Sequence, residues 1–190
     1  LWSEKSWRTF RRVAPSIVRS SYFGNKVQWN LSETPDLFNG VIRNIYLDVT
    51  LSQCKTASNG VADNCGYIPV GAMISEMSID LNSETIGSSQ DMQRNGYLFK
   101  EIITRSKDTY DHNADREGNQ WDIAKRIAKN KANASGQTLR FRLPNSIAKC
   151  RYPVMALRKS LYLNVTWRTA QQCICGDSTS NKADYTTANM

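Results

Sequence analysis

The sequence predicts an all-β fold in which two antiparallel sheets pack face to face as a sandwich, with long loops and one or two short helices. Three observations lead to this fold class. Apolar and polar residues alternate with a period of two in several segments, and long polar stretches separate these segments at uneven spacing. The length of 190 residues is sufficient for one domain with its own hydrophobic core.

The predicted strands are the segments in which every second residue is apolar, because one face of such a strand can be buried. They cover residues 27–31, 45–51, 77–81, 139–143 and 161–167, and a further short strand runs through 154–157. Leu47, Val49 and Leu51 illustrate the pattern, since polar residues stand between them. Pro144 ends the fourth segment, because proline has no N–H to donate to a strand ladder.

The connections between these strands are rich in turn-forming residues and cover 32–40, 53–67 and 105–137. Within the last connection, Trp121, Ile123, Ala124, Ile127 and Ala128 fall near helical spacing, which predicts a short helix from about 120 to 131 before 133–136 breaks it. A second weak helix or strand covers 92–103. Uneven spacing with long loops favours a sandwich over a small regular barrel, and the jelly roll is one such sandwich.

Composition divides the chain into a basic and aromatic N-terminal segment, 1–22, a single jelly-roll domain, 23–172, and a polar C-terminal tail or linker, 173–190. Two interpretations compete for the N-terminal segment. Its interleaved aromatic and basic residues fit nucleic-acid binding. Alternatively, Trp7, Phe10, Val13 and Ile17 form the apolar side of an amphipathic segment that docks against a sheet and exposes its arginines. We favour docking.

Charge is segregated along the chain, whose net charge is +8. Residues 1–26 carry +5, 27–122 carry −7, and 123–176 carry +11 because they hold eleven bases and no acid. Such segregation fits nucleic acid, anionic lipid or an acidic partner surface. It also fits a solvated basic face, since Arg140, Arg142 and Arg168 alternate with apolar residues as an outer strand face would. We leave these interpretations open.

The five cysteines, Cys54, Cys65, Cys150, Cys173 and Cys175, show no paired C-x-x-C spacing, so a zinc site is not expected. Cys54 and Cys65 bracket a polar loop and fit either a bridge or separate thiols, of which we expect thiols in a reducing compartment. Cys173 and Cys175 would lie on the same side of an extended chain, and we expect no metal there either.

We expect neither glycosylation nor a membrane-spanning helix from this sequence. Sequons occur at Asn30, Asn133 and Asn164, and we interpret them as coincidental in a chain that is not secreted, because Asn164 lies inside a predicted strand. No apolar run approaches the roughly eighteen residues that a membrane-spanning helix needs.

The sequence contains no complete catalytic motif. Its single histidine, His112, lies in a polar loop-like run, and no nucleophile elbow, phosphate-binding glycine loop or zinc-protease motif occurs. Asp108, Asp111, Asp115 and Glu117 cluster nearby, where we expect a solvated or cation-binding loop rather than an acid–base pair. We therefore predict that the protein is not an enzyme and has no catalytic, cofactor-binding or metal residues.

Several segments, taken in order, resemble the first jelly roll of the double-jelly-roll major capsid proteins of nucleocytoplasmic large DNA viruses and their relatives. WRTFRR at 7–12 resembles the family's aromatic-basic segment, and FGNKV at 23–27 resembles its entry into the first strand. DLFNGVIRNIYLDV at 36–49 is similar to the next strand, without the family's usual Gly-Asp. MSIDLNSETI at 77–86 resembles a later strand, with Asn82 and Ser83 in place of glycines. The LP at 143–144 and YPVMAL at 152–157 resemble the closing strands.

The resemblance implies a structural capsid protein of a DNA virus, located in the virion, which assembles into the capsomers of an icosahedral shell. The partners it implies are copies of the chain in a trimer, other capsid proteins, and an internal membrane or minor capsid proteins; nucleic acid is not an expected partner. Because 190 residues hold only one roll, the chain is either part of a two-roll protein or a single-roll relative such as a pentameric penton subunit.

Two other function classes fit the same residues. A β-sandwich module that binds glycans or a receptor would show the same strands and long loops. A basic nucleic-acid-binding protein would account for the clustered lysines and arginines.

Overall fold

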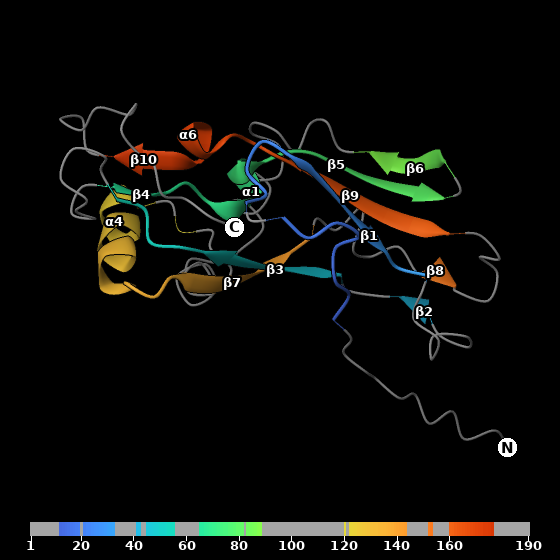
Figure 1. Ribbon diagram of the computed structural model, residues 1–190, viewed down its shortest axis with the longest axis horizontal. Coiled ribbons are helices and arrows are strands. Elements are labelled where there is room, and N and C mark those ends of the chain that lie inside the picture. Colours follow the sequence, from blue (N-terminus) through green and yellow to red (C-terminus); the bar gives the residue numbers. More distant parts are fainter. Residues whose placement is uncertain are drawn as a thin grey trace, which may run out of the picture.

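The computed structural model describes residues 12–19, 21–32, 41–42, 45–55, 65–81, 83–88, 120, 122–143, 152–153 and 160–176. These residues form two layers of antiparallel strands, with a helix at one end (Figure 1). The expected element at 92–103, the strand at 154–157, Pro144 and the region around His112 lie outside the described residues.

The first layer is a four-stranded sheet in the order β1, β9, β5, β6. These strands are Lys26–Asn30, Leu161–Trp167, Ile74–Leu81 and Glu84–Ser88, and all neighbours are antiparallel. In the second layer β3 (Tyr46–Leu51) pairs with β7 (Gln137–Arg142), and the two-residue strands β2 (Val41–Ile42) and β8 (Tyr152–Pro153) pair with each other. All five strands predicted from alternation within the described residues are present.

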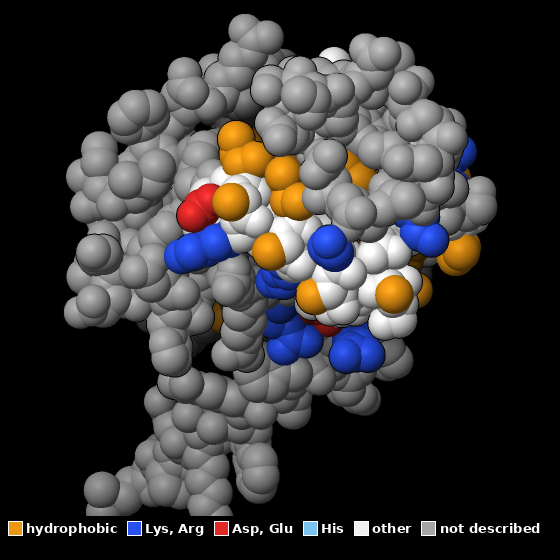
Figure 2. Space-filling view, turned by 90° about the vertical axis from the view of Figure 1, so that its left-hand side faces the viewer, with side chains coloured by type: hydrophobic (Ala, Val, Ile, Leu, Met, Phe, Trp, Pro, Cys, Tyr) orange, Lys and Arg blue, Asp and Glu red, His pale blue; other side chains and the backbone are white. Residues whose placement is uncertain are grey.

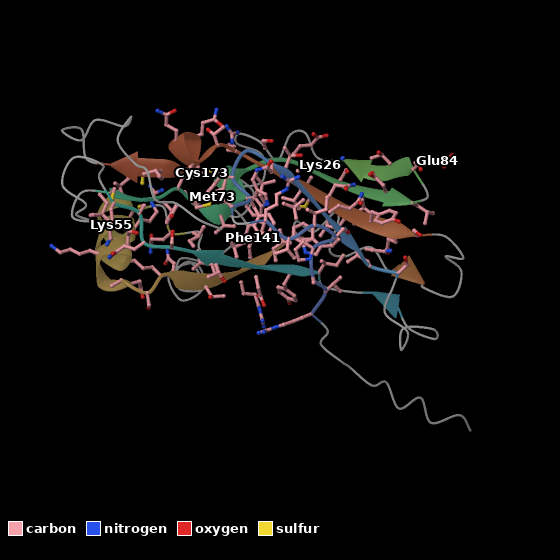
Figure 3. All side chains as sticks on the ribbon, in the orientation of Figure 1. Lys26, Lys55, Met73, Glu84, Phe141 and Cys173 are labelled. Carbon is pink, nitrogen blue, oxygen red and sulfur yellow. The ribbon has the colours of Figure 1, made fainter. Side chains whose placement is uncertain are left out.

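The core lies between the two layers, where the inner faces of the strands meet. In β3 the inward residues Leu47, Val49 and Leu51 are buried and the residues between them are exposed. Figure 3 shows Met73 from the first layer and Phe141 from the second, and both side chains are fully buried. Each such side chain stabilises the fold by about 1.5–3 kcal/mol. The sandwich predicted from the sequence is therefore confirmed.

One turn of helix interrupts each of two neighbouring strands of the first layer, next to the other's interruption. β4 (Cys65–Tyr67) precedes α1 (Val70–Met73) and β5, while β9 precedes α6 (Ala170–Cys173) and β10 (Ile174–Gly176). Backbone hydrogen bonds join the two interruptions, from Arg168 N–H to the Met73 carbonyl (2.8 Å) and from Ile68 N–H to the Cys173 carbonyl (2.9 Å). The antiparallel ribbon then resumes as β4 and β10. Strand pairing thus extends to Gly176, past the expected start of the tail at residue 173.

The predicted helix is α4, Ile123–Ala132. It begins three residues later than expected, because the Asp122 carboxylate caps it by accepting hydrogen bonds from the N–H groups of Ala124 and Lys125. The apolar residues at helical spacing do not form a buried face: Ile123 is 50% exposed, and Ala124 and Ala128 are exposed too. The residue that α4 buries is Asn130.

The Asn130 side chain joins α4 to the two chain segments beside it. Its Oδ1 accepts from the N–H of Cys54 (3.0 Å), and its Nδ2 donates to the carbonyls of Cys54 and Cys65 (both 2.9 Å). Gly66, one residue after Cys65, makes the contact close, since a Cβ there would lie 3.1 Å from backbone atoms of Arg126 and Ile127. The helix is thus positioned by a polar side chain and a glycine rather than by an apolar stripe.

The turns at Ser83 and Gly136 depend on a left-handed backbone conformation. Ser83, between β5 and β6, has φ +77°, which glycine adopts more easily than serine. It stands at one of the two positions where the capsid-protein family that the sequence resembles has glycines. Gly136, between α4 and β7, has φ +89°, and a Cβ there would lie 2.6 Å from the Leu51 carbonyl oxygen. The predicted break at 133–136 is therefore confirmed, with Gly136 required by both its φ and its close approach to β3.

We predict that Asn130→Ala lowers the free energy of unfolding by about 1–3 kcal/mol, because the buried Cys54 N–H loses its acceptor and the Cys54 and Cys65 carbonyls each lose one donor. Urea unfolding followed by circular dichroism measures the change. Lys125→Ala, at an exposed position of the same helix, is the matched control and should change stability by less than about 0.5 kcal/mol. An Asn130→Ala protein as stable as the parent would contradict the role assigned to this side chain.

Candidate interaction surfaces

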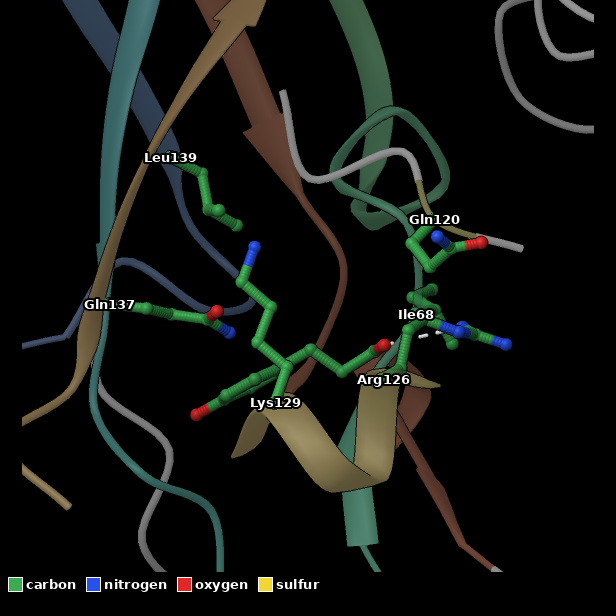
Figure 4. A pocket seen from close by; sticks show the side chains of 7 residues that line it. Ile68, Gln120, Arg126, Lys129, Gln137 and Leu139 are labelled. Atoms are coloured by element: carbon green, nitrogen blue, oxygen red, sulfur yellow. Dashed lines mark hydrogen bonds between the residues drawn. The ribbon is translucent and has the colours of Figure 1, made fainter. Parts of the chain in front are cut away.

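The cavity between α4 and β7, with a volume of about 30 Å³, is too small for a substrate (Figure 4). It is lined by Gln120, Arg126, Lys129, Gln137 and Leu139 among others, and Arg126 Nη1 donates to the Tyr67 carbonyl at its wall (3.2 Å). Such a volume holds one or two water molecules. His112 and the acidic cluster at 108–117 lie outside the described residues.

The side chains of Cys54, Cys65 and Cys173 are buried. No disulfide joins Cys54 to Cys65, and the Cys65 thiol donates to the Cys54 carbonyl (3.1 Å). Burial raises the pKa of the Cys54 thiol far above its usual range and that of Cys173 to about 12, so both remain protonated at neutral pH. Cys173 is the last residue of α6, so Cys173 and Cys175 do not lie on one extended strand as expected. Among the residues described, no group of three potential metal ligands occurs.

The end of the sandwich that carries α4 is basic where the structure describes it. Figure 2 views this end and shows Lys and Arg side chains spread among apolar ones. Lys55, after β3, and Lys125, in the first turn of α4, are exposed. Ile123 adds an exposed apolar side chain beside them. This surface can contact an acidic partner.

The outer face of the four-stranded sheet carries a row of hydrogen-bonded polar side chains. Asn164, at its centre in β9, is only 2% exposed. Its Oδ1 accepts from Gln28 Nε2 of β1 (3.0 Å), and its Nδ2 donates to Ser78 Oγ (3.2 Å) and to Asp80 of β5. Thr85 of β6 donates to the other oxygen of Asp80 (3.0 Å). The row crosses all four strands, so its polar side chains satisfy one another within the sheet.

The side chains of all three sequon asparagines make hydrogen bonds within the chain. The Asn164 amide is buried and its N–H groups are engaged by Ser78 and Asp80, so it does not present a glycan acceptor. Asn133 Nδ2 donates to the Lys129 carbonyl (2.6 Å). The Asn30 side-chain oxygen accepts from Ser32 (2.6 Å from its Oγ), which fixes the chain at the end of β1.

An apolar cavity of about 240 Å³ opens between β1, the edge strand of the first sheet, and β3 in the opposing layer. We call it the edge slot and define it by the residues that line it: Pro15, Tyr22, Val27, Trp29, Leu47, Asp48, Val49, Thr50 and Trp167. Residues 12–19, the strap, reach the slot through Pro15, and Ser16 N–H donates to the Gln28 carbonyl of β1 (2.8 Å). The two sheets are therefore not sealed along this edge.

The strap docks differently from the amphipathic segment expected in the sequence. Ser16 and Pro15 contact the sandwich, whereas Ile17 is 62% and Val18 80% exposed. Ile17 is thus not on a buried face, because the bond from Ser16 to β1 fixes the strap as an extended chain rather than a helix. Trp7 and Phe10 lie outside the described residues.

Asp48, on the outer side of β3, is the acidic residue at the slot. Arg140 of β7 donates two hydrogen bonds to its carboxylate, from Nε (2.7 Å) and from Nη2 (2.9 Å). Arg12 Nε of the strap lies 3.9 Å from Asp48 Oδ2. The hydrogen bond from Arg140 holds the pKa of Asp48 below its usual value of 3.8, and the charges of Arg140 and Arg12 add to the effect. The acidic middle of the chain and its two basic blocks therefore meet within one molecule.

No helix in the parts of the chain described here combines the length and apolar character needed to cross a bilayer.

We predict that Asp48→Asn lowers stability at pH 7 and lowers it by less at about pH 3. The pKa of Asp48 is depressed on folding, so the carboxylate contributes stability above its unfolded value of 3.8 and loses it as the pH falls through the lower folded-state value. The midpoint of urea unfolding, measured across this pH range, follows the change. Glu84→Gln, an exposed carboxylate on β6, is the control. An equal loss at both pH values would contradict the ion pair with Arg140.

The comparisons with known proteins agree with this architecture. Neither a protein-family model nor a curated protein matches the chain. A crystal structure of VP54 of the virus PBCV-1, fitted into a cryo-EM reconstruction of the virophage Sputnik, aligns with 98% of this chain at a TM-score of 0.56 and 13% identity. A quasi-atomic model of the PBCV-1 virus capsid aligns with 98% at a TM-score of 0.52 and 15% identity.

In both cases the chain spans 43% of the length of the solved chain. The resemblance that the sequence suggested is thus confirmed at the level of the fold: the chain is a jelly-roll sandwich similar to part of PBCV-1 VP54.

Proposed function

We propose that this chain is a structural subunit of a DNA-virus capsid that assembles with copies of itself. The observation that carries the proposal is the likeness of its fold, over 98% of the chain, to VP54 and to the PBCV-1 capsid model. The surfaces agree with such a role. Contacts between copies need polar faces and exposed segments rather than a catalytic cavity. The outer face around Asn164 is polar. The strap exposes Ile17 and Val18.

The finer form of the proposal is a capsomer whose copies stand side by side in an icosahedral shell of the virion. A trimer follows if the chain is the first of two rolls, and a pentamer follows if it is a single-roll penton subunit. Closed rings of this kind use heterologous contacts, in which one surface of each copy meets a different surface of the next. The basic end at α4 and the acidic outer side of β5, with Glu76 and Asp80, are two such different surfaces.

We expect the purified chain to form a closed oligomer of three or five copies. Native mass spectrometry and sedimentation velocity at increasing protein concentration measure the number of copies. A single copy at every concentration would contradict the proposal, and specific binding of that single copy on a glycan array would favour a glycan- or receptor-binding module. Salt-dependent binding of single copies to DNA would instead favour the nucleic-acid-binding alternative.

We predict that association between copies weakens as the ionic strength rises. Exposed Lys55 and Lys125 lie at one end, and exposed Glu84 lies on the edge strand β6, so contacts between unlike surfaces of two copies pair opposite charges. Salt screens such exposed pairs, since the Debye length falls from about 10 Å at 0.1 M to about 3 Å at 1 M. Sedimentation velocity across this range checks the prediction. Association that is equally strong throughout would show that charge pairing does not hold the copies together.

A further inference from the structure

The edge slot has the size and the walls of a site for a small aromatic molecule. An apolar cavity of about 150 Å³ accepts benzene, and the slot, at about 240 Å³, has room for a larger ring system. Three of the residues that line it are aromatic, Tyr22, Trp29 and Trp167, and the opposing layer adds Leu47 and Val49. Because aromatic rings attract one another beyond the area that they bury, this lining favours a ring over an aliphatic chain.

The two tryptophans that line the slot carry indole N–H groups without an acceptor. Trp167 is only 4% exposed and Trp29 is partly buried, and within the described residues neither indole donates a hydrogen bond. A buried Trp N–H usually has an acceptor, because burial removes the water that would otherwise accept from it. A molecule in the slot that carries an acceptor atom would satisfy one of these donors.

The strap reaches the slot but does not fill it. Pro15 lines the slot, whereas Ile17 and Val18, the larger apolar side chains of the strap, are 62% and 80% exposed. The hydrogen bond from Ser16 N–H to the Gln28 carbonyl holds the strap in this course along β1. Cavities larger than a water molecule are few in a native core. A space of this size beside two indole donors is therefore the feature of the described chain that best fits a ligand.

We infer that the edge slot binds a small molecule of two fused aromatic rings, in which a ring nitrogen or oxygen accepts a hydrogen bond from the indole N–H of Trp29 or Trp167. The inference goes beyond the proposed function and does not require copies to associate, because the residues that define the slot belong to one chain. The bound rings lie between β1 and β3 and so contact both layers. Since such a molecule binds the folded chain, it raises the unfolding temperature as its concentration rises.

Quinoline and naphthalene are matched probes for the slot. They have the same fused-ring shape, but only quinoline has a ring nitrogen that accepts a hydrogen bond. The full chain is labelled with ¹⁵N-tryptophan, and the indole N–H signals of Trp29 and Trp167 in the NMR spectrum are assigned with the variants Trp29→Phe and Trp167→Phe. Titration with each probe then gives its affinity and shows which indole groups it contacts.

We expect the indole signals of Trp29 and Trp167 to shift saturably with both probes. Quinoline should bind about two- to tenfold more tightly than naphthalene, which is the range that one net hydrogen bond supplies. Trp29→Phe and Trp167→Phe each keep an aromatic wall and remove one donor, so one of these two variants should bind both probes equally. Ile123→Ala, which removes an exposed apolar side chain from α4, is the control for nonspecific apolar binding and should leave both affinities unchanged.

Two variants that fill the slot complete the test. Val27→Phe and Leu47→Phe each place a ring in the slot from opposite layers and should abolish binding. Two positions are used because a larger side chain can strain a packed core, and the titration of the parent chain decides the matter if both variants unfold. Indole signals of Trp29 and Trp167 that stay in place up to the solubility limit of the probes would overturn the inference. Unchanged affinity in a folded filling variant, or equal affinity of the parent for the two probes, would overturn it too.

Discussion

The structure depends on one strand, β9, which is buried on both of its faces. Its inner side chains, Leu161, Leu163 and Val165, form the centre of the core, and its outer face buries Asn164. β1 and β5 pair with its two edges, so strands from the start and the middle of the chain meet only through a strand near its end. The sheet therefore completes only after this strand has joined it, and these long-range pairings make slow folding the physical expectation.

The burial of Asn164 also determines what the protein offers to partners. Polar side chains engage one another across all four strands, so the described part of the outer face around Asn164 is polar. Apolar contact with another molecule is instead available where the two sheets part, at the edge slot and the strap. A subunit that joins copies through edges and loops has this distribution.

Alternation in the sequence could predict the strands because one-sided burial imposes a period of two, as Leu47, Val49 and Leu51 show. It could not predict α1 and α6, since a single turn of helix inside a strand is too short to show a period. The buried face of α4 was also out of reach, because Asn130 is buried for its bonds to the backbone of Cys54 and Cys65, far away in sequence. Gly66, between two buried residues, was the available signal of that close contact. The edge slot forms beside β1, an edge strand of its sheet. The alternation of apolar and polar residues does not indicate which strands lie at a sheet edge, so the slot could not be predicted.

We propose that this jelly roll packs against copies of itself. Electron microscopy of the purified chain tests it most directly, because class averages show the shape and symmetry of individual assemblies. The account predicts rings or shells with a three-fold or five-fold axis, built from upright sandwiches. If the images show only separate particles, each the size of one sandwich, even at high protein concentration, the proposal is contradicted.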